Sequence, residues 1–521
     1  MSSGDLVEKI SPYVLGIDLG TSTSIVSVYR RGRPEVLPVF GEKIVPSVVH
    51  YRKEAVPLIG LQAKRRVLID PDSTVVSIKR QMGNSEYQRE INGKAIRPEE
   101  VSALILEHLK NGAQEQESIA GTVKYAVVTI PANFNNNQRE ATLRAGQLAG
   151  LEILRLVEEP VAAAIAYGFG HEREQTILIY DLGGGTFDVC ILKVQSADGA
   201  APSFSVLGKA GIPELGGDDF DQALMKLLAA EVVKEGGPDI LDMKKDQGIS
   251  KKKIREAQQI LKEKAEEAKI ELSVAETTAV DVPNLVKDES GRDFHLSCEV
   301  SRAQFETAIA PLVAQSRTGI EQALTEAKLT TDDIDRIILV GGSTRSPCIR
   351  TLVTEMFGKE PYGDIDPGTA VSLGAAILGA TFELPGESKP EEDVVAMIEE
   401  TNTTSHFLGI EIQGQRFSTI LEKGSELPCE NTKQYTTSQD NQPELRISVF
   451  QFPSATEAID MKIQGAACLG EFHLGPLEPL PKGKLLLDVK FSINASGVLK
   501  VTASSTGSKG NVGHELEVRV S

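Results

Sequence analysis

A short pattern that occurs twice restricts the folds open to this chain more than any other feature. Residues 14–21 read VLGIDLGT and residues 179–186 read IYDLGGGT, so each copy holds an apolar run, an Asp, a Leu, a glycine turn and a Thr. Each copy is followed by a second β-like run, at residues 25–29 and 187–194, and two strands joined by a tight glycine turn indicate a hairpin. Because the Asp and the Thr both recur, the repeat predicts two related halves that face a common cleft.

Strand-like and helix-like segments alternate over residues 1–385. Examples lie at residues 125–130, 136–149, 159–169, 176–180 and 337–340. This alternation is typical of α/β domains with largely buried sheets. Residues 250–272 are rich in Lys, Glu and Ala, with apolar residues at helical spacing, which predicts a long amphipathic helix. We therefore expect an α/β domain over residues 1–385.

The chain changes character after residue 385. Residues 386–405 are polar, acidic and largely unpatterned, which is typical of a linker. In residues 406–521, short β-like runs alternate with Gly, Pro and Asn turns, and residues 494–497 separate two runs as a hairpin turn would. We expect residues 406–521 to form a β-sandwich without a helical lid.

Composition excludes several classes of protein. The chain has 521 residues, of which 40% are hydrophobic and 25% charged, so a folded multidomain protein is expected. Its formal net charge of −19 disfavours nucleic acids and anionic membranes as partners. Five cysteines without a CxxC pair predict neither a disulfide framework nor a zinc site. Without a signal peptide or an apolar stretch of ~18–20 residues, we expect no membrane span and a cytoplasmic location.

The strongest chemical signal is the loop at residues 181–188, which reads DLGGGTFD. Three consecutive glycines allow backbone N–H groups to approach an anion and to form a phosphate cradle. Asp181 and Asp188 flank the cradle with the hard oxygen ligands that Mg²⁺ prefers, usually through water, and Thr186 adds a hydroxyl. A plain glycine turn with exposed acids is the alternative, but the matching turn after Asp18 favours a nucleotide site.

Three weaker features fit the same ligand. The stretch GGSTR (341–345) follows an apolar strand, where α/β sheets place ligands, and its Arg could stack on a flat ring. Glu266, Lys269 and Ser273 share one face of the predicted helix and could bond a ribose and a base. Lys79 could stabilise charge on a γ-phosphate. Spacing alone leaves ordinary interpretations open: a plain turn, a solvated stripe and a surface lysine.

Together the motifs resemble those of the DnaK-type heat-shock protein 70 (Hsp70) chaperone family, within the actin and sugar-kinase superfamily. The resemblance covers almost the whole chain, in the order that the family shows. It rests on GIDLGTSTS (16–24), IKRQMG (78–83), VVTIPANFNNNQR (127–139), EEPVAAAIAYGFG (158–170), YDLGGGTFDV (180–189), ELGGDDFD (214–221), AEEAKIELS (265–273), GGSTRSP (341–347) and DNQPELRISVFQ (440–451). It implies an α/β fold: a two-lobed actin-like ATPase domain with ribonuclease H-like motifs, followed by an all-β peptide-binding sandwich.

The resemblance also implies roles for residues around ATP or ADP and Mg²⁺. The metal and its waters would be organised by Asp18, Asp181 and Asp188. The catalytic set would be Lys79, Glu159, Asp181 and Thr186. The two phosphate turns would consist of Gly20, Thr21, Ser22 and Thr23, and of Gly183, Gly184 and Gly185. The nucleoside would lie beside Gly216, Gly217, Glu266, Lys269, Ser273, Gly342, Ser343 and Arg345.

In the sandwich, the resemblance implies a pocket for extended apolar segments of unfolded proteins. Its lining would be Leu408, Ile410, Tyr435, Leu445, Ile447 and Leu477. The segment would bind through main-chain hydrogen bonds, with one apolar side chain inserted, although ordinary sandwich-core residues would show the same pattern. Further partners implied are a J-domain co-chaperone, in a groove that includes Arg155, and a nucleotide-exchange factor.

We interpret the sequence as an ATP-dependent chaperone that hydrolyses ATP to drive cycles of binding and release of extended apolar segments. Two departures favour an alternative, a slow or non-hydrolysing nucleotide-dependent module that docks one specific protein through its β-domain. The family's Leu-rich linker is not recognisable, the nearest stretch being residues 393–398, and we expect a short form that lacks the family's α-helical lid. A sugar kinase of the same superfamily is disfavoured by the C-terminal sandwich.

Overall fold

The structure, a computed structural model, describes residues 10–116, 119, 121–132, 134–168, 174–195, 203–242, 249–287, 291–363, 365–384, 390, 393, 395, 404, 406–425, 427–453, 455–456, 458–460, 463, 466–494, 498–506 and 512–519. The chain divides into two compact units. The first takes in residues 1–131, 142–202 and 207–398, and the second takes in residues 132–141, 203–206 and 399–521. No helix in the described ranges is both long enough and apolar enough to cross a membrane.

The first sheet carries the first copy of the sequence repeat. Its strands follow the order β11-β10-β1-β2-β3, and β4 pairs with β2. The strand β1 pairs antiparallel with β2 across the glycine turn and parallel with β10. The bounds are β1 (Val14–Leu19), β2 (Thr23–Arg30), β3 (Arg33–Val36), β4 (Val45–Pro46), β10 (Tyr125–Ile130) and β11 (Glu152–Glu158). Asp18 therefore lies at the end of a central strand, where the chain turns.

The second sheet repeats this local topology around the second copy. Its order is β14-β13-β12-β17, in which β12 pairs antiparallel with β13 and parallel with β17. The bounds are β12 (Glu174–Leu182), β13 (Phe187–Gln195), β14 (Ser203–Ile212) and β17 (Arg336–Val340). Asp181 stands opposite Asp188 in the β12–β13 pair, at the mouth of the glycine turn. The two halves predicted from the repeat are thus present as two sheets of matched design.

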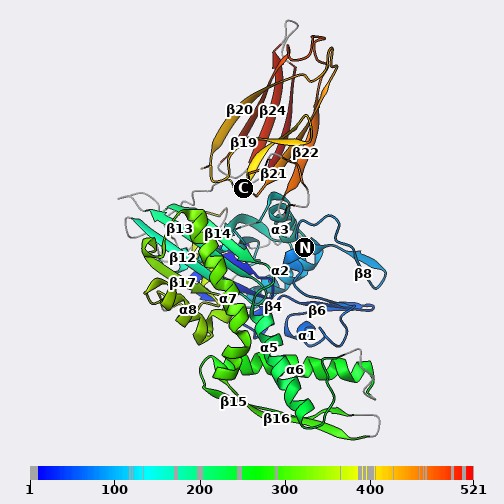
Figure 1. The fold of residues 1–521 in the computed structure, drawn as a ribbon, viewed down its shortest axis with the longest axis vertical. Coiled ribbons are helices and arrows are strands. Elements are labelled where there is room, and N and C mark those ends of the chain that lie inside the picture. Colours follow the sequence, from blue (N-terminus) through cyan, green and yellow to red (C-terminus); the bar gives the residue numbers. More distant parts are fainter. Residues whose placement is uncertain are drawn as a thin grey trace, which may run out of the picture. The chain divides into compact units, whose positions relative to one another are not determined.

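Helices cover these sheets. The helix α9 is buried along most of its length and packs against β1, β2 and α4, which explains why its sequence is apolar on all sides. The bounds are α1 (Leu61–Lys64), α2 (Pro98–Gln114), α3 (Asn136–Leu148), α4 (Glu159–Ala166), α5 (Gly217–Lys234), α6 (Lys251–Leu272), α7 (Arg302–Ala327), α8 (Pro347–Phe357) and α9 (Ala370–Ala380). Residues of α5 to α8 and of the second sheet share one large apolar core. The course of these helices can be followed in Figure 1.

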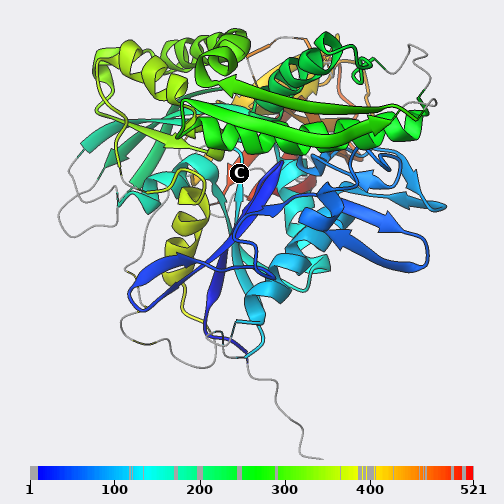
Figure 2. The ribbon, with the colours of Figure 1, turned by 90° about the horizontal axis from the view of Figure 1, so that it is seen from below.

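The predicted amphipathic helix is α6, and its bounds match the expectation closely. Ser250 precedes it as the N-cap residue and its side chain accepts a hydrogen bond from the N–H of Lys253. Ile254, Ala257 and Leu261 of the apolar stripe are buried. The hairpin of β15 (Thr277–Lys287) and β16 (Asp293–Ser301) lies along α6 (Figure 2).

Short elements complete the first unit. Three further strands pair in the order β6-β5-β7, and β8 pairs with β9. The bounds are β5 (Val49–Arg52), β6 (Ala55–Ile59), β7 (Thr74–Val75), β8 (Arg89–Ile91), β9 (Lys94–Ile96) and, as 3-10 turns, η1 (Ile78–Gln81), η2 (Thr331–Asp333) and η3 (Gly342–Arg345). The turn η1 holds Lys79, and η3 holds the glycine motif that follows β17.

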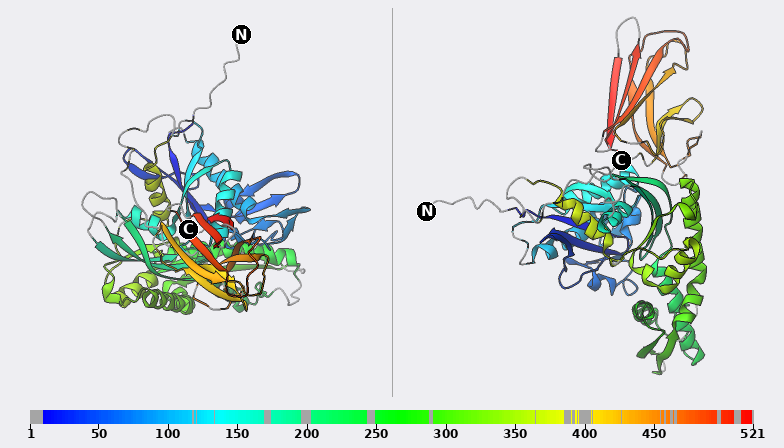
Figure 3. Two further views of the ribbon diagram at one scale, coloured as in Figure 1. Left: turned by 90° about the horizontal axis from the view of Figure 1, so that it is seen from above. Right: turned by 90° about the vertical axis from the view of Figure 1, so that its left-hand side faces the viewer.

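The second unit contains two four-stranded sheets, in the orders β19-β18-β21-β22 and β20-β23-β24-β25. Residues of both sheets enclose one apolar core, so the two sheets form a sandwich (Figure 3). The bounds are β18 (Phe407–Ile412), β19 (Arg416–Leu421), β20 (Cys429–Thr436), β21 (Leu445–Phe452), β22 (Ala467–Leu474), β23 (Leu486–Ile493), β24 (Val498–Thr506) and β25 (Val512–Arg519). The expected β-sandwich is confirmed.

The aromatic residues of β21 lie on the second face of their sheet, outside the main core of the sandwich. Phe450 and Phe452 lie on the side of β21 opposite Ile447 and Val449 and form a separate cluster with Phe417. The rings of Phe417 and Phe452 lie 4.6 Å apart between centroids. This second cluster explains why apolar residues follow one another in β21 instead of alternating with polar ones.

Most of the expected linker, residues 386–405, lies outside the described residues, as do residues 394 and 396–398 of its apolar stretch and residues 495–497 of the expected hairpin turn. Asp393 is described and is 1% exposed. Its Oδ1 accepts a hydrogen bond from the N–H of Gly32 at 3.1 Å, and its Oδ2 accepts one from the hydroxyl of Tyr13 at 3.3 Å. This point of the segment is therefore held on the first unit.

Candidate functional site

The two glycine turns, separated by more than a hundred residues in the sequence, touch one another. A Cβ atom placed on Gly184 would lie 2.6 Å from the Cβ and 2.7 Å from the Oγ of Ser22, distances that side chains do not tolerate. A Cβ on Gly185 would lie 3.5 Å from the Cγ2 of Thr21. Glycine at residue 184 is thus required for the close approach of the two turns. The structure brings together the two predicted phosphate turns, one from each sheet.

The second turn is also joined to two other predicted segments. The N–H of Gly217 donates to the carbonyl of Gly183 at 3.0 Å, and the hydroxyl of Ser343 donates to the same carbonyl at 2.9 Å. The first turn is closed by Ser47, whose hydroxyl donates to the carbonyl of Gly20 at 2.8 Å. Thr23 is the first residue of β2 and is exposed. Residues from four separate motifs therefore converge around one loop.

Lys79 and Glu159 form an ion pair beside the turns. Their Nζ and Oε1 atoms are 2.5 Å apart, and the side chains are only 6% and 14% exposed. Lys79 comes from η1, and Glu159 is the first residue of α4, where the helix dipole favours a carboxylate. The predicted catalytic lysine is therefore a buried cation and not a surface lysine.

Three carboxylates share the electric field of this ion pair. Burial, followed by the charge of Glu159, raises the pKa of Asp18 to about 7 and that of Asp188 to about 7. The same causes, together with Asp188 and Asp18, raise the pKa of Asp181 well above its usual value. Asp18 accepts a hydrogen bond from the hydroxyl of Thr129 at 3.2 Å, which favours its charged form. The site thus concentrates acidic groups that repel one another.

The donor set fits a hydrated Mg²⁺ better than a directly ligated metal. The four carboxylates of Asp18, Glu159, Asp181 and Asp188 outnumber the nearby lysines Lys79 and Lys209, so the fully ionised cluster carries an excess of negative charge that a divalent cation would neutralise. Within the described ranges, however, no three His, Cys, Asp or Glu side chains lie close enough together to hold a metal ion. Mg²⁺ commonly keeps several waters and contacts carboxylates through them, which suits this arrangement.

The predicted nucleoside residues have polar partners of their own, and Lys269 is linked to the second turn through Gly217. The Nζ of Lys269 donates to the carbonyl of Gly217 at 3.1 Å and forms an ion pair with Asp221 at 2.7 Å. Glu266, one turn earlier on α6, forms an ion pair with Lys64. Ser273 follows the last residue of α6, and its hydroxyl donates to the carbonyl of Ile270. Arg345 of η3 forms an ion pair with Asp366, and both side chains are about half exposed.

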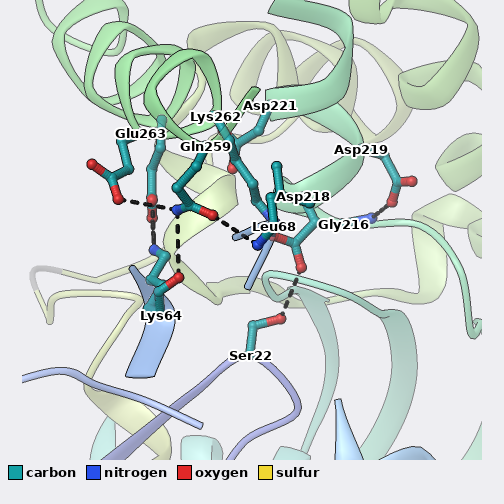
Figure 4. A network of polar contacts seen from close by, with 12 residues as sticks. Ser22, Lys64, Leu68, Gly216, Asp218, Asp219, Asp221, Gln259, Lys262 and Glu263 are labelled. Carbon is teal, nitrogen blue, oxygen red and sulfur yellow. Dashed lines mark hydrogen bonds and ion pairs between the residues drawn. The ribbon is translucent and has the colours of Figure 1, made fainter. Parts of the chain in front are cut away.

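A network that the sequence did not predict links the two halves (Figure 4). The hydroxyl of Ser22 donates to Asp218 at 3.3 Å, and Asp218 lies 3.8 Å from the ammonium of Lys262. The amide of Gln259 accepts from the N–H of Leu68 at 3.0 Å and also donates to Glu263 at 3.0 Å. These contacts hold the first phosphate turn and the segment after α1 against α5 and α6.

Three residues of the site were missed for different reasons. Arg80 donates a hydrogen bond to the carbonyl of Gly185, and its place beside Lys79 was the available signal. Asp218 lies in the GGDDFD stretch, so the motif itself pointed to it. Lys64 and Glu266 are paired across 202 positions, and a lysine that opens the basic run KRR (64–66) carries no signal of such a contact.

The residues expected to line the peptide pocket belong to the interior of the sandwich. Leu408, Ile410, Ile447 and Leu477 are at most 7% exposed and form part of its apolar core. Tyr435 and Leu445 are partly buried against this core. The hydroxyl of Tyr435 lies 2.9 Å from that of Ser418, and burial raises the pKa of Tyr435. The six residues form one cluster, whose partly exposed members are Tyr435 and Leu445.

Matched sheets that end in facing glycine turns, with acidic residues around them, define a two-lobed nucleotide-binding unit of the actin-like ATPase class. The family model described as Hsp70 protein matches residues 14–520. The chain is 41% identical over 501 residues to the chaperone protein DnaK of Thermotoga neapolitana and to that of Thermotoga maritima, covering 95% of this chain and 79% of each relative. It is 40% identical over 498 residues to the chaperone protein DnaK of Thermosipho melanesiensis, covering 95% and 78%.

The chain therefore belongs to the Hsp70 family, whose members are ATP-binding and ATP-hydrolysing chaperones that act in protein folding and the stress response. Its fold is the one that the sequence predicted, an actin-like ATPase unit of two lobes followed by a β-sandwich.

Proposed function

We propose that this chaperone hydrolyses ATP to ADP and phosphate, with Mg²⁺, to drive cycles of binding and release of extended apolar segments of unfolded proteins. The observation that carries the proposal is the contact between the turns at Ser22 and Gly184, beside the buried ion pair of Lys79 and Glu159. Backbone amides of glycine turns cradle phosphates, and a buried lysine stabilises charge that develops on a transferred phosphoryl group.

Each polar residue of the site has a distinct task in this proposal. Asp18, Asp181 and Asp188 would hold a hydrated Mg²⁺, which would supply positive charge opposite the phosphates. Glu159 orients Lys79 through their 2.5 Å contact, so that the ammonium points to the γ-phosphate. Asp181 is the candidate acceptor of the proton from the attacking water, and the hydroxyl of Thr186 lies on the same turn.

The nucleoside lies along the wall of α6 and η3 in this proposal. Lys269 and Ser343 already meet the second phosphate turn through Gly217 and Gly183. In this proposal the wall also includes Glu266 and Ser273 at α6, Gly342 and Arg345 of η3, and Gly216, which directly precedes α5. ATP and ADP therefore share one binding surface for the base and the sugar.

The sandwich supplies the substrate site in this proposal. An extended apolar segment binds beside Tyr435 and Leu445, the partly exposed members of the cluster, and inserts one side chain toward Leu408, Ile410, Ile447 and Leu477. A J-domain co-chaperone and a nucleotide-exchange factor act on the ATPase unit, and the protein works in the cytoplasm.

One observation favours the alternative function, a nucleotide-dependent module that docks one protein partner and hydrolyses ATP slowly or not at all. Four of the six expected peptide residues are buried in the sandwich core, with exposures of 1% for Leu408, 5% for Ile410, 6% for Ile447 and 7% for Leu477. A core that stays closed would bind no apolar side chain. A fluorescent apolar peptide should bind and should exchange faster with ATP than with ADP, whereas equal off-rates in both states would favour the alternative.

The Lys79→Ala variant tests the proposed ATPase mechanism. We expect steady-state phosphate release to fall by about 100-fold or more, since a charge that acts on the transition state is lost, while ATP still binds. Phosphate release and ATP affinity are measured for the same preparations. The matched control is Lys193→Ala, which removes a lysine that pairs with Glu174 at the surface. Normal hydrolysis by Lys79→Ala would contradict the proposal.

A further inference from the structure

A buried carboxylate lies outside the set of residues that the proposed function uses. Asp221, on α5, is 2% exposed and lies next to the network that joins α5 and α6 (Figure 4). Its Oδ1 is 2.7 Å from the Nζ of Lys269 on α6. Among the described residues no well-directed hydrogen bond reaches this oxygen, so the ammonium is its neighbour of opposite charge.

The charge of Asp221 is costly to bury. Burial raises its pKa to about 6, and the positive charge of Lys269 opposes this rise. Glu266 and Asp218 also face it and add to the rise. An ionised carboxylate in such a place is held by its partner, and removing one member of a buried pair leaves an uncompensated charge. The position of the ammonium is therefore tied to the position of Asp221.

The ammonium held in this way lies where the nucleotide motifs meet. Lys269 donates to the carbonyl of Gly217 at 3.1 Å, and its side chain is 15% exposed. A Cβ on Gly217 would lie 3.1 Å from the Nζ of Lys269, 2.5 Å from the Oγ of Ser343 and 3.6 Å from the Cα of Gly184. The ammonium thus contacts Gly217, the residue that itself lies against the phosphate turn and against Ser343 of the expected nucleoside wall.

A lysine at this position without a buried partner would be a poorer contact for a nucleotide. The free side chain samples many rotamers, and a nucleotide would have to overcome the loss of this freedom in order to engage it. Asp221 and Gly217 fix two directions of the ammonium before any ligand arrives. Because the carboxylate also neutralises the ammonium, the pair is a directed donor of low net charge, which suits a neutral oxygen or nitrogen acceptor better than a phosphate.

We propose that Asp221 is a positioning residue for nucleotide binding, which holds the ammonium of Lys269 so that it donates to the nucleoside part of the ligand. This inference rests on the proposed function, because it takes Lys269 to be a nucleotide contact. The inference further predicts that the affinities for adenosine, ADP and ATP depend on Asp221 to the same degree. The reason is that the ammonium of Lys269 donates to the nucleoside, which all three ligands share.

The affinities of adenosine, ADP and ATP for Asp221→Asn test this inference. All three should weaken by about tenfold, the effect of losing one charge-assisted contact. Asp221→Glu, which keeps the charge, should restore most of the affinity, and a merely structural role would not predict this rescue. The matched control is Glu231→Gln, which removes an acid of the same helix that pairs with Lys234 at the surface.

A double-mutant cycle decides whether Asp221 acts through Lys269. Lys269→Met should weaken binding by a similar factor, and adding Asp221→Asn should cause no further loss. If Asp221→Asn alone does not fold, the double variant, which leaves no unpaired buried charge, is compared with Lys269→Met. Additive losses, or an affinity of Asp221→Asn equal to that of the wild type, would overturn the inference.

These outcomes separate the inference from the function on which it rests. Failure of the wild type to bind ATP at all would overturn the proposed function and this inference with it. Binding that depends on Lys269 but not on Asp221 would leave the proposed function standing and would refute the inference alone.

Discussion

The carboxylates of the site repel one another when they are ionised, so a nearby positive charge is needed to balance them. Asp188 illustrates this, because burial and the charge of Glu159 raise its pKa to about 7, while Lys79 and the hydroxyl of Thr186 oppose the rise. Above that pH the ionised carboxylate remains in a region that already holds other carboxylates. We infer that these carboxylates lower the free energy of unfolding of the ligand-free protein. The same concentration of negative charge gives the site a strong preference for a cation.

The Asp188→Asn variant should reveal this cost in the protein freed of nucleotide and magnesium. The folded pKa of about 7 lies above the usual 3.8, so the folded state binds more protons than the unfolded state between these values. Stability due to Asp188 therefore falls as the pH rises through this window, by about 1.4 kcal/mol for each unit of pKa difference. Asp188→Asn should accordingly be more stable than the wild type at about pH 8 and similar to it at about pH 4.

Urea unfolding in the presence of a chelator, over a series of pH values, measures the effect of Asp188→Asn. Asp72→Asn, which alters an exposed aspartate, serves as the control and should change the unfolding free energy little at any pH. If Asp188→Asn is less stable than the wild type at high pH, or if the difference in unfolding free energy does not vary with pH, ionisation of Asp188 does not destabilise the folded protein.

At the level of elements, the turn between β2 and β3 holds the segment that leads toward the sandwich. Arg31 and Gly32 have φ values of 54° and 70°, as is typical of a tight two-residue hairpin turn. The N–H of Gly32 donates to the buried carboxylate of Asp393. Burial, together with Asp393, raises the pKa of Tyr13, the second donor to this carboxylate. A hairpin of the first sheet is thus the anchor of this segment.

The Asp393→Ala variant tests the anchor. Loss of the acceptor should increase the rate of hydrogen exchange at the N–H of Gly32 by about tenfold or more, since the protecting hydrogen bond is removed. Asp393→Asn keeps an oxygen acceptor of the same shape and is the matched control. Exchange at Gly32 that is as slow in Asp393→Ala as in the wild type would show that the N–H has another partner.

For the whole molecule, much of the architecture could be predicted because it follows from local pattern. The strand at residues 125–130 and the helix at 250–272 were predicted within one or two residues, since apolar periodicity and capping act within a few positions. The repeated glycine turn predicted two halves, because a strand, an Asp and a tight turn constrain the same hairpin in both places.

The contacts that join distant parts could not be predicted in this way. Asp221 and Lys269 were both visible in quoted motifs, but their pairing depends on how α5 packs against α6. The ion pair of Lys64 and Glu266 likewise depends on tertiary packing, which periodicity does not encode. The same limit applies to the sandwich, because the sequence pattern around Ile447 is the same whether the residue belongs to the core or to a peptide pocket.

Single-turnover hydrolysis of ATP by the wild-type protein tests the central claim most directly. The claim is that carboxylates and glycine turns of both halves enclose a magnesium-bound triphosphate, and that hydrolysis there serves the capture of apolar segments. We predict phosphate release with Mg²⁺, none with excess chelator, and a faster rate when an unfolded apolar peptide is present. Absence of magnesium-dependent phosphate release by the folded wild-type protein would contradict the account.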